Sequence, residues 1–193
     1  MNKLVPELRF KEFSGEWEEK ELIDICKMQA GKFVQASEIY NNFSESLNPC
    51  FGGNGLRGYT KSYTHIGNYP LIGRQGELCG NIKFAIGQFH ATEHAVVSEP
   101  IGKTNRLYLY YLLITLKLNQ YATGQAQPGL SVKVLEKVKA SAPSDEKEQQ
   151  KIATCLTSLD SLIAATYKKE AALKQHKKGL MQQLFISGEA QCD

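Results

Sequence analysis

Residues 53–58 read Gly-Asn-Gly-Leu-Arg-Gly and match the dinucleotide-binding pattern Gly-x-Gly-x-x-Gly. In that pattern the glycines bring backbone close to a pyrophosphate, which binds at the N-terminus of the helix that follows. The pattern therefore needs a strand before it and a helix after it. Here Asn48-Pro49 comes before, and the run Tyr-Thr-Lys-Ser-Tyr at 59–63 favours a strand. We interpret the segment as a tight glycine loop that brings backbone close to another group, and not as a nucleotide site.

Residues 90–94 read His-Ala-Thr-Glu-His, the order found in some zinc peptidases. A zinc site of that kind needs both histidines on one face of a long helix, together with a third ligand. Val96, Val97 and Pro100 follow at once and disfavour such a helix. The alternative that we prefer is a pair of buried histidines whose hydrogen bonds are satisfied within the fold.

No other catalytic signature is present in the sequence. Asp145-Glu146-Lys147 has the order of a nuclease Asp-x-Lys ending, but it lies where a helix begins rather than where a strand ends. The chain contains no Walker loop, no Gly-x-Ser-x-Gly elbow and no Asn/Asp-Pro-Pro-Tyr/Phe signature of a methyltransferase. We therefore expect a non-catalytic protein that holds no metal and no cofactor of its own.

The elements that must hold these loops predict an α+β fold. Between residues 27 and 100 glycine recurs every few residues, and β-type runs at 69–72 and 95–97 lie between turns, as in an irregular mixed sheet. A helix is expected from a cap at Thr104 or Asn105 to about Leu118, and a short helix from Ser131. The apolar face of the first helix is expected to consist of Leu107, Tyr111, Ile114 and Leu118.

The last quarter of the chain predicts one long helix with a coiled-coil seam, because the following positions alternate in steps of four and three. They are Ile152, Leu156, Leu159, Ile163, Thr166, Glu170, Leu173, Lys177, Leu180 and Leu184. Asp145 and Glu148 are expected to form a capping box at its start. At about 1.5 Å per residue over some 40 residues, the helix should be roughly 60 Å long. Its apolar stripe needs a partner.

Composition sets the remaining limits. With 193 residues and 42% hydrophobic residues, the chain can bury one core. Residues 27–139 carry twelve bases against six acids, which is compatible with phosphate binding without proving it. The longest apolar run, 107–116, is too short to cross a bilayer. Five scattered cysteines without a Cys-x-x-Cys pair suit a reducing cytoplasm, so we expect a cytoplasmic protein that does not bind membranes.

Several segments, taken in order, resemble one family. They are PELRF at 6–10 with Phe13 and Trp17, GGNGLRGY at 52–59, LIGRQG at 71–76 with CGN at 79–81, ATEHAV at 91–96, TGQAQPGLS at 123–131, Pro143 with EQQKI at 148–152, and KKGLMQQLF at 177–185. Together they resemble the DNA-specificity (S) subunits of type I restriction-modification enzymes, over nearly the whole chain.

The resemblance implies a subunit that reads one half of a bipartite DNA sequence and whose long helix docks methyltransferase (M) and restriction (R) subunits. Those partners would carry the chemistry, with S-adenosylmethionine, ATP and magnesium. The resemblance also implies three parts of the chain. They are a target-recognition domain at 1–143, a dimerisation or spacer helix at 144–187 and a tail at 188–193. The family normally has two recognition domains and two helices, so this chain is either a natural half-subunit or a fragment, and a second copy would supply the second helix.

The residues expected to contact DNA are Lys32, Asn54, Arg57, Tyr59, Lys61, Arg74, Gln75, Gln125 and Gln127. Arginine and lysine suit guanine or phosphate, and asparagine and glutamine suit adenine. An alternative of equal weight is that these residues hold loops together, while the stretches at 35–48 or 82–89 read the bases. The target bases do not follow from the sequence. The rival function is a protein-interaction adaptor that recruits partners through its helix.

The seam positions are symmetric about residue 168, since each pair of positions counted from the two ends sums to 336. Two copies can therefore pair antiparallel as a twofold-symmetric homodimer. In that register Ile152 meets Leu184 of the second copy, Leu156 meets Leu180, Leu159 meets Lys177, Ile163 meets Leu173, and Thr166 meets Glu170. A parallel pair would instead place Glu170 on Glu170 and Lys177 on Lys177, which like-charge repulsion disfavours.

Overall fold

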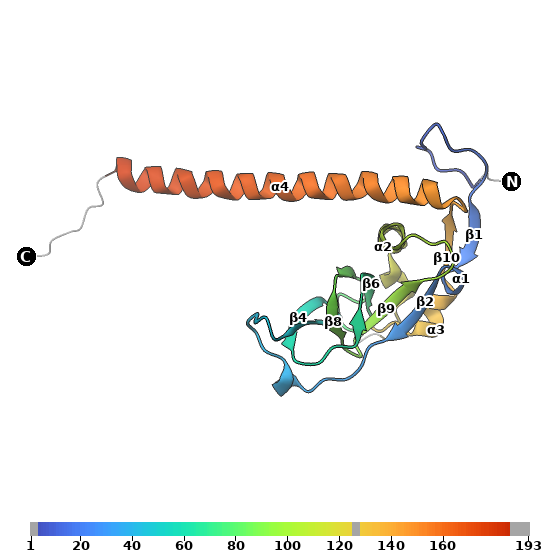
Figure 1. Ribbon diagram of the computed structural model, residues 1–193, viewed down its shortest axis with the longest axis horizontal. Coiled ribbons are helices and arrows are strands. Elements are labelled where there is room, and N and C mark those ends of the chain that lie inside the picture. Colours follow the sequence, from blue (N-terminus) through green and yellow to red (C-terminus); the bar gives the residue numbers. More distant parts are fainter. Residues whose placement is uncertain (1–3, 125–127, 186–193) are drawn as a thin grey trace, which may run out of the picture. The chain divides into compact units, whose positions relative to one another are not determined.

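The computed structural model describes residues 4–124 and 128–185. The chain divides into two compact units, residues 1–153 and residues 154–193. The described strands and short helices belong to the first unit, and the second contains most of the long helix α4, Glu146–Leu184 (Figure 1). The predicted α+β class, with irregular sheets and a long C-terminal helix, is confirmed.

The described strands form three sheets. A two-stranded antiparallel sheet pairs β1 (Glu18–Glu21) with β10 (Lys139–Ala142). An antiparallel sheet has the strand order β2 (Cys26–Ala30), β9 (Ala95–Pro100), β6 (Tyr69–Gly73) and β7 (Ile82–Ala85). A mixed sheet has the order β4 (Gly55–Thr60), β3 (Asn48–Gly52), β8 (Gln88–Ala91) and β5 (His65–Ile66), with β3 and β8 parallel. The strands expected at 69–72 and 95–97 are thus β6 and β9.

The central strands β6 and β9 are buried on both faces. On one face, Ile72 and Val96 belong to the main core with residues of α2 (Arg106–Thr115). On the other face, Leu71 and Val97 pack with Phe89 in a smaller cluster. Because neighbouring residues of a strand point to opposite faces, such a strand reads as a continuous apolar run. The α2 helix therefore covers one side of the antiparallel sheet, and residues of β8 contribute to the core on the other.

The short helices begin at the predicted caps. The Asn105 side chain accepts a hydrogen bond of 3.0 Å from the Tyr108 N–H at the start of α2, and Ser131 accepts one of 3.2 Å from Val134 at the start of α3 (Val132–Glu136). A short helix α1 (Leu22–Ile25) and two 3₁₀ turns, η1 (Ala36–Glu38) and η2 (Leu118–Tyr121), complete the set.

The predicted apolar face of α2 is only partly right, because Leu107 and Leu118 contact the main core but the buried face of the helix is a different one. Its buried residues are Tyr108, Leu109, Leu112 and Leu113. Ile114 is 46% exposed, and Leu118 lies beyond the helix in η2. The cause is the composition of the segment, since nearly every residue is apolar and the helical period is hidden. Packing against β6 and β7 then decided which side of α2 is buried, with Tyr110 contacting Phe84 of β7 at 5.3 Å between ring centroids.

The predicted capping box of α4 is also wrong. Asp145 does cap the helix, because its carboxylate accepts a hydrogen bond of 2.8 Å from the Lys147 N–H. Glu148, however, is only 1% exposed and faces Arg9, whose Nε and Nη2 each donate to one of its carboxylate oxygens at 2.7 Å. Trp17 Nε1 donates to the same carboxylate at 3.3 Å. Leaving a buried carboxylate without a charged partner costs more free energy than leaving a helix without a second capping bond, so Glu148 pairs with Arg9.

Beyond Ala153, the side chains of α4 are largely exposed. Ile152, the first position of the predicted seam, packs against the main core of the first unit. Farther along, Leu159 and Ile163 are each 51% exposed, Leu173 59% and Leu184 74%. The helix therefore keeps an apolar stripe that residues of the described chain do not cover.

Candidate nucleic-acid interface

The glycine segment at 53–58 forms the tip of the β3–β4 hairpin. Gly52 pairs with Gly55 across a two-residue turn, Gly53-Asn54. The register shifts by one residue beyond the tip, because Cys50 pairs with Gly58 while Phe51 pairs with Leu56. Arg57 is the extra residue of this β-bulge, a feature that redirects side chains at functional edges. No helix follows the glycines, so the nucleotide-binding alternative is excluded for this segment.

Three loops meet at the hairpin tip through their backbones. A Cβ on Gly73 would lie 1.9 Å from the Gly53 carbonyl oxygen, and a Cβ on Gly53 would lie 3.1 Å from the Gln75 carbonyl oxygen. The Arg74 N–H donates to the His94 carbonyl at 3.0 Å, which ties the β6 end to the turn between β8 and β9. The expectation that the glycines bring backbone close to another group is therefore confirmed, and that group is the protein's own backbone.

The three loops enclose an open groove of about 420 Å³. It is lined by Gly52, Gly53, Asn54, Gly55, Leu56, Arg57, Gln75, Gly76 and His94. Asn54, Arg57 and Gln75 are exposed predicted DNA-contact residues that the fold brings together here. Between them they offer two amides, which can donate and accept, and a guanidinium fork, the groups that read base edges.

His94 is a groove residue that sequence reasoning did not select for DNA contact. Its side chain is 40% exposed, and its Nε2 lies 3.2 Å from Glu93 Oε1. The second carboxylate oxygen of Glu93 is buried and has no hydrogen-bond partner among the described residues. The sequence marked this histidine only through a zinc-motif pattern and the segment ATEHAV at 91–96, neither of which indicates a DNA contact. Its position beside Gln75 depends on backbone contacts between distant loops and carries no local signal.

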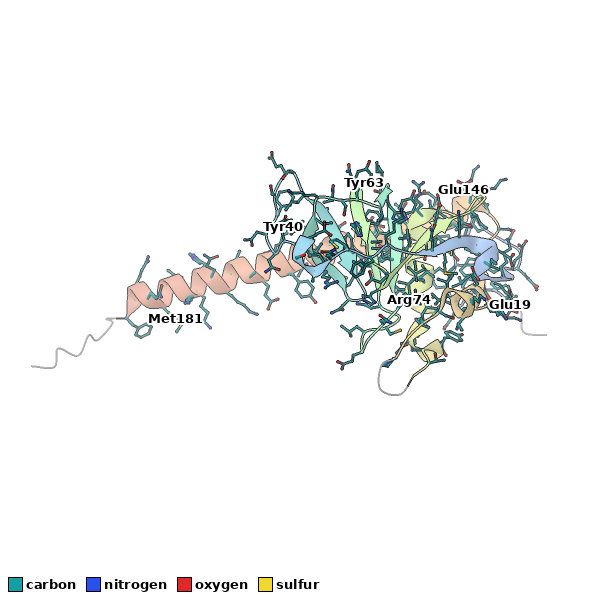
Figure 2. The ribbon with its side chains drawn as sticks, turned by 90° about the horizontal axis from the view of Figure 1, so that it is seen from below. Glu19, Tyr40, Tyr63, Arg74, Glu146 and Met181 are labelled. Atoms are coloured by element: carbon teal, nitrogen blue, oxygen red, sulfur yellow. The ribbon has the colours of Figure 1, made fainter. Side chains whose placement is uncertain are left out.

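Arg74 has a different environment from Arg57. It lies in the first unit among the loops that follow β6 (Figure 2). Burial raises the pKa of the Cys79 thiol, while a backbone hydrogen bond from Leu130 and the charge of Arg74 lower it, so the guanidinium lies near that thiol. The Arg74 Nε is buried without a hydrogen-bond partner among the described residues. Arg74 is therefore partly enclosed, and it does not line the groove.

Lys32, Tyr59 and Lys61 are not among the residues that line the groove. The Tyr59 backbone pairs with Tyr40 through two hydrogen bonds of 2.7 and 2.8 Å, and its ring contacts Phe43 edge to face at 5.5 Å. Lys32 and Lys61 are exposed. Of the predicted DNA-contact residues, Asn54, Arg57 and Gln75 therefore line the groove, and Arg74, Lys32, Tyr59 and Lys61 do not. Gln125 and Gln127 lie outside the described residues. The alternative stretches at 35–48 and 82–89 contain η1 and β7 and are not among the residues that line the groove.

The predicted pair of buried, satisfied histidines is confirmed for His90 and wrong for His94, whose side chain is 40% exposed at the groove. His90 is 4% exposed, with Nε2 at 3.0 Å from the Lys32 carbonyl oxygen and Nδ1 at 3.0 Å from Ser62 Oγ. A carbonyl oxygen only accepts, so Nε2 carries a proton and donates, and the Ser62 hydroxyl, which can donate or accept, is the partner of Nδ1. His90 lies in strand β8 and His94 lies beyond the end of that strand, so the two histidines do not share a helical face.

Three further observations concern metals, thiols and membranes. Within residues 4–124 and 128–185, no group of three histidine, cysteine, aspartate or glutamate side chains is arranged to hold a metal ion. Cys26, Cys50 and Cys79 are buried free thiols, and Cys155 is an exposed one. None of the described helices is long and apolar enough to cross a membrane.

Comparison with known proteins agrees with this geometry. Residues 14–175 match the family of type I restriction modification DNA specificity domains. The EcoprrI specificity subunit of Escherichia coli is 47% identical over 156 residues, covering 80% of this chain and 39% of that protein. The MjaVIII specificity subunit of Methanocaldococcus jannaschii is 27% identical over 205 residues, covering 92% and 47%.

Solved structures show the same fold. The S subunit of a type I restriction-modification system from M. genitalium superposes with a TM-score of 0.73 at 16% identity, covering 91% of this chain and 47% of that one. The HsdS subunit from Thermoanaerobacter tengcongensis superposes with a TM-score of 0.59 at 19% identity, covering 94% and 47%. The chain thus spans less than half the length of each of these relatives. Since the family match covers most of its residues, the chain belongs to the type I restriction-modification DNA specificity family.

Proposed function

We propose that this chain is a non-catalytic DNA-specificity subunit of a type I restriction-modification system in the cytoplasm. Its recognition domain, residues 1–143, reads one half of a bipartite double-stranded DNA target. Its helix, residues 144–187, pairs with a second copy and docks M and R subunits. Those subunits supply the chemistry with S-adenosylmethionine, ATP and magnesium, and this chain holds none of these cofactors.

The observation that carries the DNA-reading part is the groove at the hairpin tip. Asn54, Arg57 and Gln75 come from two separate loops and line one groove with His94. Amide and guanidinium groups match the donor and acceptor pattern of the major groove. Backbone contacts between glycines hold the loops in place, so the side chains meet DNA from a rigid frame, which favours specific readout.

A salt titration tests this part of the proposal. Fluorescence anisotropy of a labelled duplex with the full chain should show binding that weakens steeply as salt rises, because phosphate contacts release counterions. A protein-interaction adaptor would give no DNA signal at any salt. Sequencing the methylated positions of host DNA would then identify the target, and the methylated motif should change when Asn54, Arg57 or Gln75 is replaced.

The exposed stripe supports the pairing part of the proposal. Leu159, Ile163 and Leu173 are more than half exposed, and an apolar stripe of this length is stable in water only against a partner. In the antiparallel register, Asp160 of one copy also lies near Lys174 of the other, since positions 160 and 174 flank the seam on the same side. In the single chain Lys174 forms an ion pair with Glu170 at 2.7 Å. Association would therefore bring the carboxylate of Asp160 from the second copy close to Lys174 as another partner.

A further inference from the structure

The two loops joined by His90 each carry a lysine next to an exposed aromatic ring. Lys32 precedes Phe33, which is 71% exposed, and Lys61 lies two residues before Tyr63, which is 52% exposed. Tyr63 lies at the edge of the domain, well apart from Arg74 (Figure 2). The segments 31–34 and 61–64 contain these two lysines and no acidic side chain. Each segment therefore carries one positive charge and one exposed ring.

Both segments are fastened to the strand β8. The Lys32 N–H donates to the Ala91 carbonyl at 2.9 Å, and a Cβ on Gly31 would lie 2.1 Å from that same oxygen. On the other segment, the Thr64 N–H donates to the Phe89 carbonyl at 2.9 Å. His90 lies between these attachments and hydrogen-bonds to both segments. The spacing of the two lysine and aromatic pairs is therefore set by β8 and the His90 ring.

We propose that Lys32, Phe33, Lys61 and Tyr63 form a surface that binds a nucleic-acid strand with unpaired bases. The lysines would contact phosphates and the rings would stack on bases, the combination by which proteins hold single strands. This inference rests on the proposed function, because it takes DNA as the ligand. It adds a ligand form, the unpaired strand, whose exposed base faces can stack on the aromatic rings of this surface.

The composition of the surface favours this ligand over the two others that could cover it. The backbone of a closed duplex presents phosphates and sugars, which leave an exposed phenyl ring without an apolar partner. A partner protein could cover the rings, but lysine is depleted in protein–protein interfaces, and here every charged residue of the two segments is a lysine. His90 touches no ligand in this arrangement and acts as a positioning residue.

The test compares a labelled thymidine strand of about 20 nucleotides, alone and annealed to its complement, by anisotropy with the full chain. Replacing both rings, Phe33→Ala with Tyr63→Ala, should weaken single-strand binding by roughly 5- to 150-fold per ring and leave duplex binding within about twofold. Ile23→Ala, which removes a 49% exposed apolar side chain of α1, is the matched control and should change neither. Equal losses on strand and duplex would overturn the proposal.

The positioning role of His90 is tested separately. Ser62→Ala removes the hydrogen bond between Ser62 Oγ and His90 Nδ1 by a change at an exposed residue. His90→Gln keeps an N–H donor but loses the ring that bridges the two segments. Each change should weaken single-strand binding in the wild-type chain. Neither should weaken it further in the double variant Phe33→Ala with Tyr63→Ala, because the rings that His90 positions are already absent. Both changes should also speed trypsin cleavage after Lys32 and Lys61 but not after Lys103, an exposed lysine on another loop. Unchanged cleavage and affinity for Ser62→Ala would exclude the positioning role even if His90→Gln does not fold.

The outcomes for the wild-type chain separate this inference from the proposed function. Binding to both the strand and the duplex supports both. Binding to the duplex alone overturns the strand-binding surface and leaves the proposed function intact. Binding to neither nucleic acid at low salt overturns the proposed function and this inference with it.

Discussion

The groove and the stripe of α4, which serve duplex reading and pairing in the proposed function, are built in opposite ways. The groove walls hold one another through backbone contacts, such as the one between Gly53 and Gly73. The stripe, with Leu159 and Leu173 more than half exposed, has no such contacts within the described chain. The shape of the groove is therefore set before a ligand arrives, whereas the stripe can bury its apolar area only when a partner binds.

The same substitution should have opposite effects in the two regions. Gly73→Ala places a Cβ 1.9 Å from the Gly53 carbonyl oxygen, so the loops must separate, and the free energy of unfolding should fall by about 3 kcal/mol. Gly179→Ala lies in α4 with no atom within 4 Å of the new Cβ, so it should stabilise the helix by about 1 kcal/mol. Near-UV and far-UV circular dichroism during urea unfolding would measure the two effects. A neutral Gly73→Ala would mean that backbone contact does not hold the groove together.

Charge at one stripe position should reveal the pairing register. Leu159→Glu would face Lys177 of a second copy, and Leu159→Lys would face the same charge. Both should weaken the dimer, and the lysine variant should weaken it by about 1–2 kcal/mol more, counting both symmetric contacts. Sedimentation measures the dissociation constants. Equal losses would show that the register is wrong, and a monomeric wild type at micromolar concentration without any added partner would exclude self-pairing.

Replacing Arg57 or Arg74 should distinguish a residue that contacts DNA from one that stabilises the loops. Arg57 is exposed at a bulge, so Arg57→Ala should leave the melting temperature unchanged and cost about 1–3 kcal/mol in site binding if it reads a base. Arg74→Ala should weaken binding too, but it should also lower the melting temperature, because its Nε is buried beside other loops. Anisotropy and thermal denaturation of the assembled enzyme would report both quantities. If neither variant changes affinity or specificity, these loops are a scaffold only.

The smallest effect is expected from metal removal. Since the described residues offer no three-ligand cluster, dialysis against EDTA should change neither duplex binding nor dimerisation. Metal analysis of the purified chain should find less than one zinc per chain. A 1:1 zinc content that His94→Ala abolishes would overturn this prediction and revive the zinc motif at residues 90–94.

The elements that the sequence predicted correctly are those with a local cause. The spacing of apolar residues every three or four positions identified α4, because such a period is hard to produce in anything but a helix. Asn105 and Ser131 were recognised as caps, since their side chains satisfy N–H groups only a few residues away. The glycine segment was only partly predicted, because Gly53-Asn54 form the tight turn while residues 55–58 belong to β4.

The errors arose where a distant residue competed with a local one. Glu148 was expected to cap its own helix, yet it pairs with Arg9, which lies 139 residues earlier. The face of α2 was misjudged because its apolar residues have no clear period, so contacts with β6 and β7 decided which side is buried. Neither contact leaves a trace in the local sequence.

The sequence by itself determined the family, the long helix with its apolar stripe, and the presence of glycine loops that carry polar side chains, because each depends on residues close together in the chain. Only the tertiary structure decided that Asn54, Arg57, Gln75 and His94 line one groove and that His90 joins Lys32 to Ser62. These groupings depend on backbone contacts between loops tens of residues apart. Such contacts form only when the whole core has assembled, so no local pattern encodes them.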